Sequence, residues 1–150
     1  MAQDYAKARE WFEKAADKGD ASAMSDLGRL CANGHGVAQD YTKAREWFEK
    51  AADKGDANAM SDLGGLYANG HGVAQDYAKA REWFEKAAVK GDASAMSSLG
   101  GLYASGLGVA LDHAKARDWY EKAVAAGDAK ATALLDKLSS SKRSSGRIVK

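Results

Sequence analysis

The sequence contains no proline, and only one of its 150 residues is a cysteine. Proline lacks a backbone N–H and its ring clashes with the preceding helical turn. Its absence, together with abundant Ala, Glu, Lys, Leu and Met, favours helix throughout. One cysteine excludes an intramolecular disulfide. We interpret Cys31 as a small buried apolar residue, because no base that could activate the thiol lies near it in sequence.

Long hydrophobic runs are also missing. No apolar stretch could span a bilayer, and the N-terminal "MAQDYAKARE" has no apolar signal core. The sequence therefore predicts a soluble chain, cytoplasmic or, if a signal has been removed, periplasmic. The 22 Lys and Arg residues nearly balance the 21 Asp and Glu residues. Such a balance gives no electrostatic footprint for nucleic acid or membrane, so we expect neither as a partner.

A repeat of 36 residues organises the chain. Four tryptophans mark it, at Trp11, Trp47, Trp83 and Trp119. The units aligned on them begin near Asp4, Asp40, Asp76 and Asp112. A fixed period of this length indicates stacked supersecondary units. The first two units differ at only four positions, which indicates either recent duplication or consensus engineering.

Each unit has the pattern of two amphipathic helices. In the second unit one helix is predicted over residues 41–54, with Asp40 as its N-cap, and another over residues 57–68. The short connection through Gly55 makes the two helices antiparallel. The inward positions of the longer helix are Tyr41, Ala44, Trp47, Phe48, Ala51 and Ala52. We interpret the aromatic pair Trp47–Phe48 as core packing.

The pattern predicts eight helices, the last over about residues 128–138. Outward-facing Lys130, Asp136 and Lys137 would cap that end. Gly64 stands in mid-helix, where glycine costs about 1 kcal/mol relative to alanine. We expect the glycine to allow close approach of a neighbouring helix, and Gly28 and Gly100 repeat it.

The stretch "ANAMSDLGGLYANGHGVAQDYAKAREWFEKA" resembles the Sel1-like repeat. The residues that carry the resemblance are Ala57, Ala59, Leu63, Gly64, Tyr67, Gly70, Gly72, Val73, Asp76, Lys79, Ala80, Trp83, Phe84, Lys86 and Ala87. The resemblance covers residues 4 to about 135. It implies an all-α, right-handed α/α superhelix related to tetratricopeptide repeats. It also implies a non-catalytic scaffold or adaptor for protein complexes, common in bacteria.

A cysteine-rich branch of this family pairs two cysteines within each repeat. The corresponding positions here are Ala52 and Met60, so the chain departs from that branch. The departure weakens the small-molecule or β-lactam binding, or hydrolase-like role, that the branch would imply. A second alternative is an engineered or consensus solenoid without a native partner. No cofactor, metal or catalytic residue is predicted.

The loop "NGHGVAQD" has two glycines but lacks the preceding strand and the lysine of a phosphate-binding loop. We interpret Gly34 and Gly36 as turn residues and His35 and His71 as solvated loop residues. The third copy has Leu107 in place of histidine, so the turn does not require it.

In related superhelices the first helix of each unit lines the concave face. That analogy predicts a partner-binding groove lined by Ser22, Ser25, Asp26, Arg29, Asn58, Ser61, Asp62, Gly65, Ser94, Ser97 and Ser98. The serines and the asparagine would hydrogen-bond an extended segment, and the aspartates would receive its basic side chains. Arg29 would place a positive charge at one end of the groove and so set its polarity. The alternative is a merely solvated inner face.

The segment "SSSKRSSGRIVK", residues 139–150, breaks the repeat pattern that fills residues 1–138. Its serine-rich, basic composition is typical of disorder. One hypothesis is self-association, in which this tail meets the acidic residues of a groove, its own or a neighbour's. The basic residues are Lys142, Arg143, Arg147 and Lys150. The rival interpretations are a vector remnant or a helical extension of the last repeat.

Overall fold

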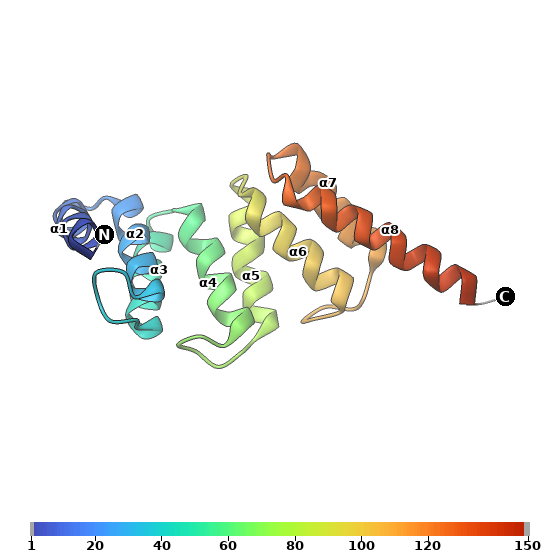
Figure 1. Ribbon diagram of the computed structural model, residues 1–150, viewed down its shortest axis with the longest axis horizontal. Helices are drawn as coiled ribbons and strands as arrows, with labels where there is room; N and C mark the ends of the chain where they lie inside the picture. Colours follow the sequence, from blue (N-terminus) through green and yellow to red (C-terminus); the bar gives the residue numbers. More distant parts are fainter. Residues whose placement is uncertain (1, 149–150) are drawn as a thin grey trace.

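The computed structural model describes the backbone of residues 2–148 and the side chains of residues 4–140. Within that part the chain forms eight helices and no strand, which confirms the all-α prediction. The helices are α1 (Ala2–Asp17), α2 (Ala21–Asn33), α3 (Tyr41–Asp53), α4 (Ala57–Asn69), α5 (Tyr77–Val89), α6 (Ala93–Ser105), α7 (His113–Ala125) and α8 (Lys130–Ile148). They follow one another in a row, so the two termini lie at opposite ends (Figure 1).

Aspartates are the N-caps of α2 to α7, and glycines are the C-caps of α2, α4 and α6. Asp40 is the N-cap of α3, and its side chain accepts a hydrogen bond from the backbone N–H of Lys43 at 3.1 Å. Such a bond satisfies one of the free amides of the first turn. Gly34 ends α2 in the left-handed conformation, at a φ of 69°. Because the same signals recur in every unit, the repeat fixes the helix boundaries locally.

From here on we count the repeated units from α2, as the helix pairs α2–α3, α4–α5 and α6–α7. Close contact between a glycine and an aromatic ring joins the first and second helix of each pair. A Cβ placed on Gly64 would lie 2.5 Å from Cε1 of Phe84, which is far inside van der Waals contact. The same contact recurs between Gly28 and Phe48 and between Gly100 and Tyr120. The predicted close approach is therefore confirmed, and its neighbour is the aromatic residue that follows each tryptophan.

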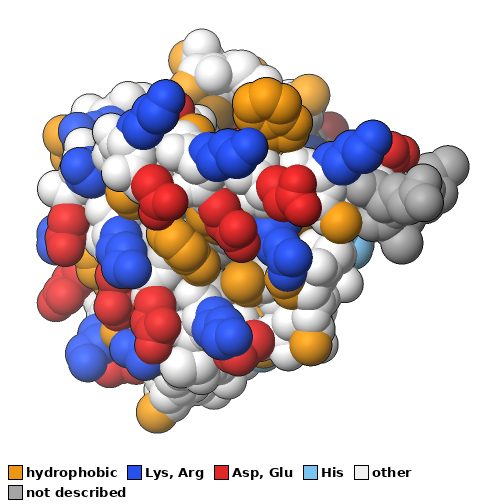
Figure 2. Space-filling model, turned by 90° about the vertical axis from the view of Figure 1, so that its left-hand side faces the viewer, with side chains coloured by type: hydrophobic (Ala, Val, Ile, Leu, Met, Phe, Trp, Pro, Cys, Tyr) orange, Lys and Arg blue, Asp and Glu red, His pale blue; other side chains and the backbone are white. Residues whose placement is uncertain are grey.

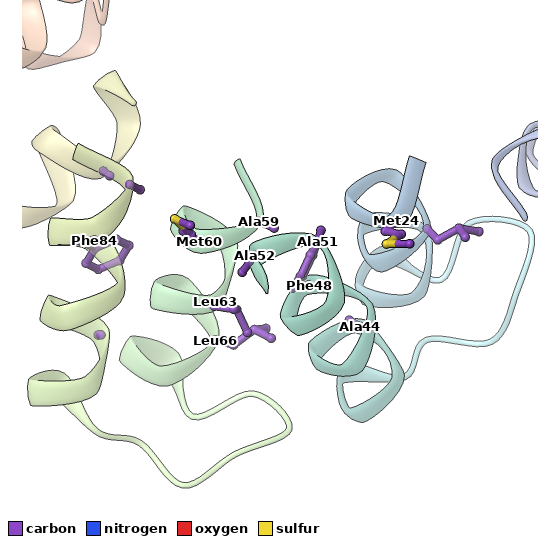
Figure 3. Close-up of a cluster of buried hydrophobic side chains, with 14 of the residues drawn as sticks. Met24, Ala44, Phe48, Ala51, Ala52, Ala59, Met60, Leu63, Leu66 and Phe84 are labelled. Carbon is purple, nitrogen blue, oxygen red and sulfur yellow. The ribbon is translucent and has the colours of Figure 1, made fainter. Parts of the chain in front are cut away.

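One core cluster runs from α1 to α6, and a second lies between α7 and α8, with Met96 packed against both. Figure 3 shows the side chains of Met24, Phe48, Leu63 and Phe84, which come in turn from α2, α3, α4 and α5. Phe48 is only 2% exposed, as predicted. Trp47 is half-buried and packs against this core, with Nζ of Lys50 4.7 Å from its ring centroid. The predicted core packing of the aromatic pair is thus confirmed.

The two ends of the row differ. At the N-terminal end Trp11 is 70% exposed, and Phe12 is half-buried where its counterpart Phe48 is buried. Figure 2 looks onto this end and shows hydrophobic side chains among intermixed basic and acidic ones. At the other end Asp136 stands at the α8 position where the other units have glycine. An aromatic ring could not approach α8 there as Phe84 approaches α4.

Helix α8 continues ten residues beyond Leu138, to Ile148. The backbone of residues 139–148 is therefore helical and not disordered. This agrees with the interpretation of the tail as a helical extension of the last repeat. Leu138 is 8% exposed and packs with Ala131 and Tyr120, whereas Ser139 and Ser140 are exposed. The basic side chains of the tail, on Lys142, Arg143, Arg147 and Lys150, lie outside the described residues. The division at residue 138 stays a prediction.

Two adjacent glycines of α4 test the helix contact. Gly64→Ala should destabilise the protein by about 1–3 kcal/mol, because its methyl group would overlap the buried Phe84 ring. Gly65→Ala is the matched control, since a Cβ there meets nothing within 4 Å. It should stabilise the helix by up to about 1 kcal/mol. Urea unfolding followed by circular dichroism measures both, and equal effects would contradict the account.

Candidate partner-binding groove

The first helices of successive units approach one another along one face of the row. Helix α4 contacts α6 directly. Helix α2 is joined to α4 by an ion pair, in which Nε of Arg29 donates to Oδ2 of Asp62 at 2.9 Å. Side chains from α2, α4 and α6 therefore lie along one face of the row.

A hollow of about 440 Å³ lies on this surface. Its lining comes mainly from the three first helices, with two aromatic side chains from α3 and α5 and one loop histidine. The residues are Arg29, Ala32, Asn33, Phe48, Ser61, Asp62, Gly65, Leu66, Asn69, His71, Phe84, Ser94 and Ser98. We call this set the inner hollow.

The inner hollow lies where the ion pair of the preceding unit is not repeated. One unit after Arg29 the residue is Gly65, and one unit after Asp62 it is Ser98. No guanidinium therefore bridges α4 and α6 as Arg29 bridges α2 and α4. A Cβ on Gly65 would meet nothing within 4 Å, so the space above this residue is open.

Two carboxylates share the single guanidinium beside the inner hollow. NH1 of Arg29 lies 3.9 Å from Oδ1 of Asp26, in addition to its bond with Asp62. Burial raises the pKa of Asp62, an effect that the charge and hydrogen bond of Arg29 oppose and that nearby aspartates reinforce. Burial likewise raises the pKa of Asp26. One arginine therefore supplies a single positive charge for two carboxylates, and this surface carries an excess of negative charge when both are ionised.

Six of the eleven predicted groove residues line the inner hollow, namely Arg29, Ser61, Asp62, Gly65, Ser94 and Ser98. The prediction that Ser25 lines the groove is wrong, because Ser25 is only 2% exposed and cannot be reached by a partner. Ser97 is half-buried, and its Oγ donates to Oδ2 of Asp128 at 2.6 Å, so it serves the fold. Asp26 lies beside Arg29, and Ser22 and Asn58 are exposed outside the lining.

Seven lining residues fall outside the eleven predicted groove residues: Ala32, Asn33, Phe48, Leu66, Asn69, His71 and Phe84. Both asparagines are the last residues of their helices, and His71 lies in the following loop. The only sequence signal for the asparagines and the histidine was the recurrence of "NGHG" at the ends of α2 and α4. The phenylalanines come from second helices, which the analogy with concave faces did not include.

The glycine–histidine–glycine loops fasten one unit to the next. A Cβ on Gly72 would lie 2.8 Å from the backbone carbon of Tyr41 in the preceding second helix. His71 stacks on the Tyr41 ring with centroids 4.4 Å apart, and His35 stacks on Tyr5 in the same way. His71 is exposed in its loop as predicted and His35 is half-buried, and each ring also makes a stacking contact that the prediction did not include. Among the described residues, no three His, Cys, Asp or Glu side chains could together hold a metal ion.

The sequence model of the Sel1 repeat matches residues 1–20, 21–56, 57–92 and 93–128. The chain belongs to the Sel1 repeat family. Proteins of this family generally mediate protein–protein interactions and are typically non-catalytic scaffolds. No helix in the described part of this Sel1 repeat chain is long and apolar enough to cross a membrane.

Several solved structures are similar to this Sel1 repeat chain. A Sel1 repeat protein from Oxalobacter formigenes matches with a TM-score of 0.82 and 38% identity, over 88% of this chain and 54% of that one. The protective antigen c5321 of uropathogenic Escherichia coli strains matches with a TM-score of 0.76 and 42% identity, over 81% and 26%. Both are much longer than the matched region.

Cysteine-rich protein B of Helicobacter pylori is also similar, with a TM-score of 0.69 and 26% identity, over 90% of this chain and 97% of that one. The relatives named here are all bacterial. No curated protein matches the chain.

The raised pKa of Asp62 predicts how stability depends on pH. An ionised Asp62 is less favourable in the folded groove than in the unfolded chain. From about pH 4 up to the raised folded pKa, the folded state therefore binds more protons, and stability falls as the pH rises. Asp62→Asn removes this loss, so its thermal midpoint relative to wild type should increase between pH 4 and pH 7.

Asp53→Asn is the control, because Asp53 is an exposed carboxyl at the end of α3, outside the inner hollow. The thermal midpoint of Asp53→Asn relative to wild type should change less between pH 4 and pH 7 than that of Asp62→Asn. Thermal unfolding followed by circular dichroism supplies both comparisons. If the Asp62→Asn difference instead decreased with rising pH, Arg29 would outweigh burial at this carboxyl.

Proposed function

We propose that this chain is a non-catalytic adaptor that binds an extended protein segment along α2, α4 and α6, with a basic side chain of the partner in the inner hollow. The observation that carries the proposal is the open space above Gly65, beside a carboxylate whose pKa burial raises. A partner cation there would supply the positive charge that one arginine does not.

The Arg29–Asp62 pair is an internal example of the proposed contact. A guanidinium from α2 lies against a carboxylate of α4 at 2.9 Å. One unit further along, the chain offers the space but not the arginine, because the residue is Gly65. An arginine or lysine of the partner would fill the place that Arg29 fills one unit earlier. Its ammonium or guanidinium group would lie within reach of Asp62 and of the Ser98 hydroxyl.

The rest of the inner hollow suits an extended backbone. Ser61, Ser94 and Ser98 present hydroxyl groups, and Asn33 and Asn69 present amides, all of which can donate and accept hydrogen bonds. The Phe48 and Phe84 side chains also line the hollow, but they are only 2% and 5% exposed, so a partner would meet chiefly the polar groups.

A basic peptide with the sequence of residues 139–150 tests the proposal. Titrated into the full chain in a calorimeter, it should bind at low salt and lose affinity in roughly 0.5 M salt, where surface charges are screened. The same peptide with its lysines and arginines replaced by glutamate should not bind. Affinity should rise from pH 4 to pH 7 as Asp62 and Asp26 ionise. This titration also tests self-association through the tail.

Gly65→Arg is the decisive variant, because its side chain would occupy the inner hollow as Arg29 occupies the preceding position. Peptide affinity should fall by at least about tenfold. Val89→Arg is the matched control, since it adds the same side chain and charge at a position that is 89% exposed and outside the hollow. Equal binding by wild type and Gly65→Arg would show that the inner hollow is not the site.

A further inference from the structure

A second cavity, of about 280 Å³, lies among α1, α2, α3 and the loop before α3. Cys31 stands in its wall, together with Lys43 and Trp47 of α3 and Arg9 and Glu13 of α1. It shares no lining residue with the inner hollow. Nothing in the proposed function uses it.

The cavity is at the position where the other units hold a tyrosine ring. Cys31 is aligned with Tyr67 and Tyr103. Those rings are half-buried against the core, and each has a lysine Nζ 5.5 Å from its centroid, Lys79 over Tyr67 and Lys115 over Tyr103. In the first unit the aligned lysine is Lys43, which lines the cavity. A thiol replaces the phenol ring, and the space remains.

We propose that the cavity beside Cys31 is a binding site for a small phenol, which would take the place of the missing tyrosine ring. An engineered apolar cavity of roughly 150 Å³ binds benzene, so this volume is sufficient for one aromatic ring. The Lys43 ammonium offers the cation–π contact that Lys79 makes with Tyr67.

The chemistry of the wall favours a phenol over a plain hydrocarbon. The cavity is lined by the apolar Leu27 and Val37 and also by Gln39 and Asp40. A hydroxyl group on the ring can bond to such polar neighbours, whereas benzene would displace water from them without compensation. Burial raises the pKa of the Cys31 thiol, which keeps it uncharged. The predicted complex is therefore reversible and non-covalent.

Phenol itself is the probe. Added to the full chain, it should raise the thermal midpoint in a saturable way, because it binds the folded state. It should also slow the reaction of Cys31 with an aromatic disulfide reagent, since ring and reagent compete for the same space. Cyclohexanol, similar in size but not aromatic, should do both less well. No protection of Cys31 at phenol concentrations that saturate the midpoint would overturn the proposal.

Three variants locate the binding. Cys31→Tyr restores the ring found in the other units, so it should raise the thermal midpoint and abolish the effect of phenol. Cys31→Ser keeps the cavity and removes the thiol, so phenol should still raise the midpoint. Tyr67→Cys should create a second site and change the stoichiometry in calorimetry from one to two. Unchanged phenol binding by Cys31→Tyr would place the ligand elsewhere and refute the proposal.

Discussion

The contact between a bare helix backbone and an aromatic ring determines the geometry of every unit. At Gly28, Gly64 and Gly100 the ring of the following helix occupies the place of a Cβ. Glycine in a helix costs about 1 kcal/mol, whereas full burial of a large apolar side chain contributes roughly 1.5–3 kcal/mol. The exchange is favourable only while the ring stays buried between neighbouring helices. Stacking of units provides that burial, so the helix pair and the row depend on each other.

Because the repeated units are nearly identical in sequence, they differ in side-chain size at only a few positions. The inner hollow and the cavity beside Cys31 each occur where one unit has a large side chain and another has a small one. Arg29 fills the position that is open at Gly65, and Tyr67 fills the position that is open at Cys31. The occupied copy shows in each case what chemistry fits the empty one. A guanidinium fits beside Asp62, and the phenol ring of Tyr67 fits beside Lys79. The filled position in one unit can therefore be compared directly with the open position in another.

Local signals made most of the fold predictable. The period, the aspartate caps, the glycine ends and the mid-helix glycines act within a few residues of the chain, and the structure has them where the sequence placed them. The groove was only partly predictable, because it depends on which side of a helix a serine faces. Ser25 is buried and Ser97 bonds Asp128, while Ser61 lines the inner hollow. The exposure of Trp11 depends on the end of the row. The helical course of the tail was not apparent from its serine-rich composition.

Amide chemical-shift mapping would test the central claim most directly, that a partner binds where the repeat leaves out a side chain. The full chain, labelled with ¹⁵N, would be titrated with the basic peptide of residues 139–150. The account predicts saturable shifts centred on Ser61, Gly65 and Ser98, with α3 and α7 nearly unchanged. Shifts spread over the outer helices, or centred on α1 and its exposed tryptophan, would contradict it.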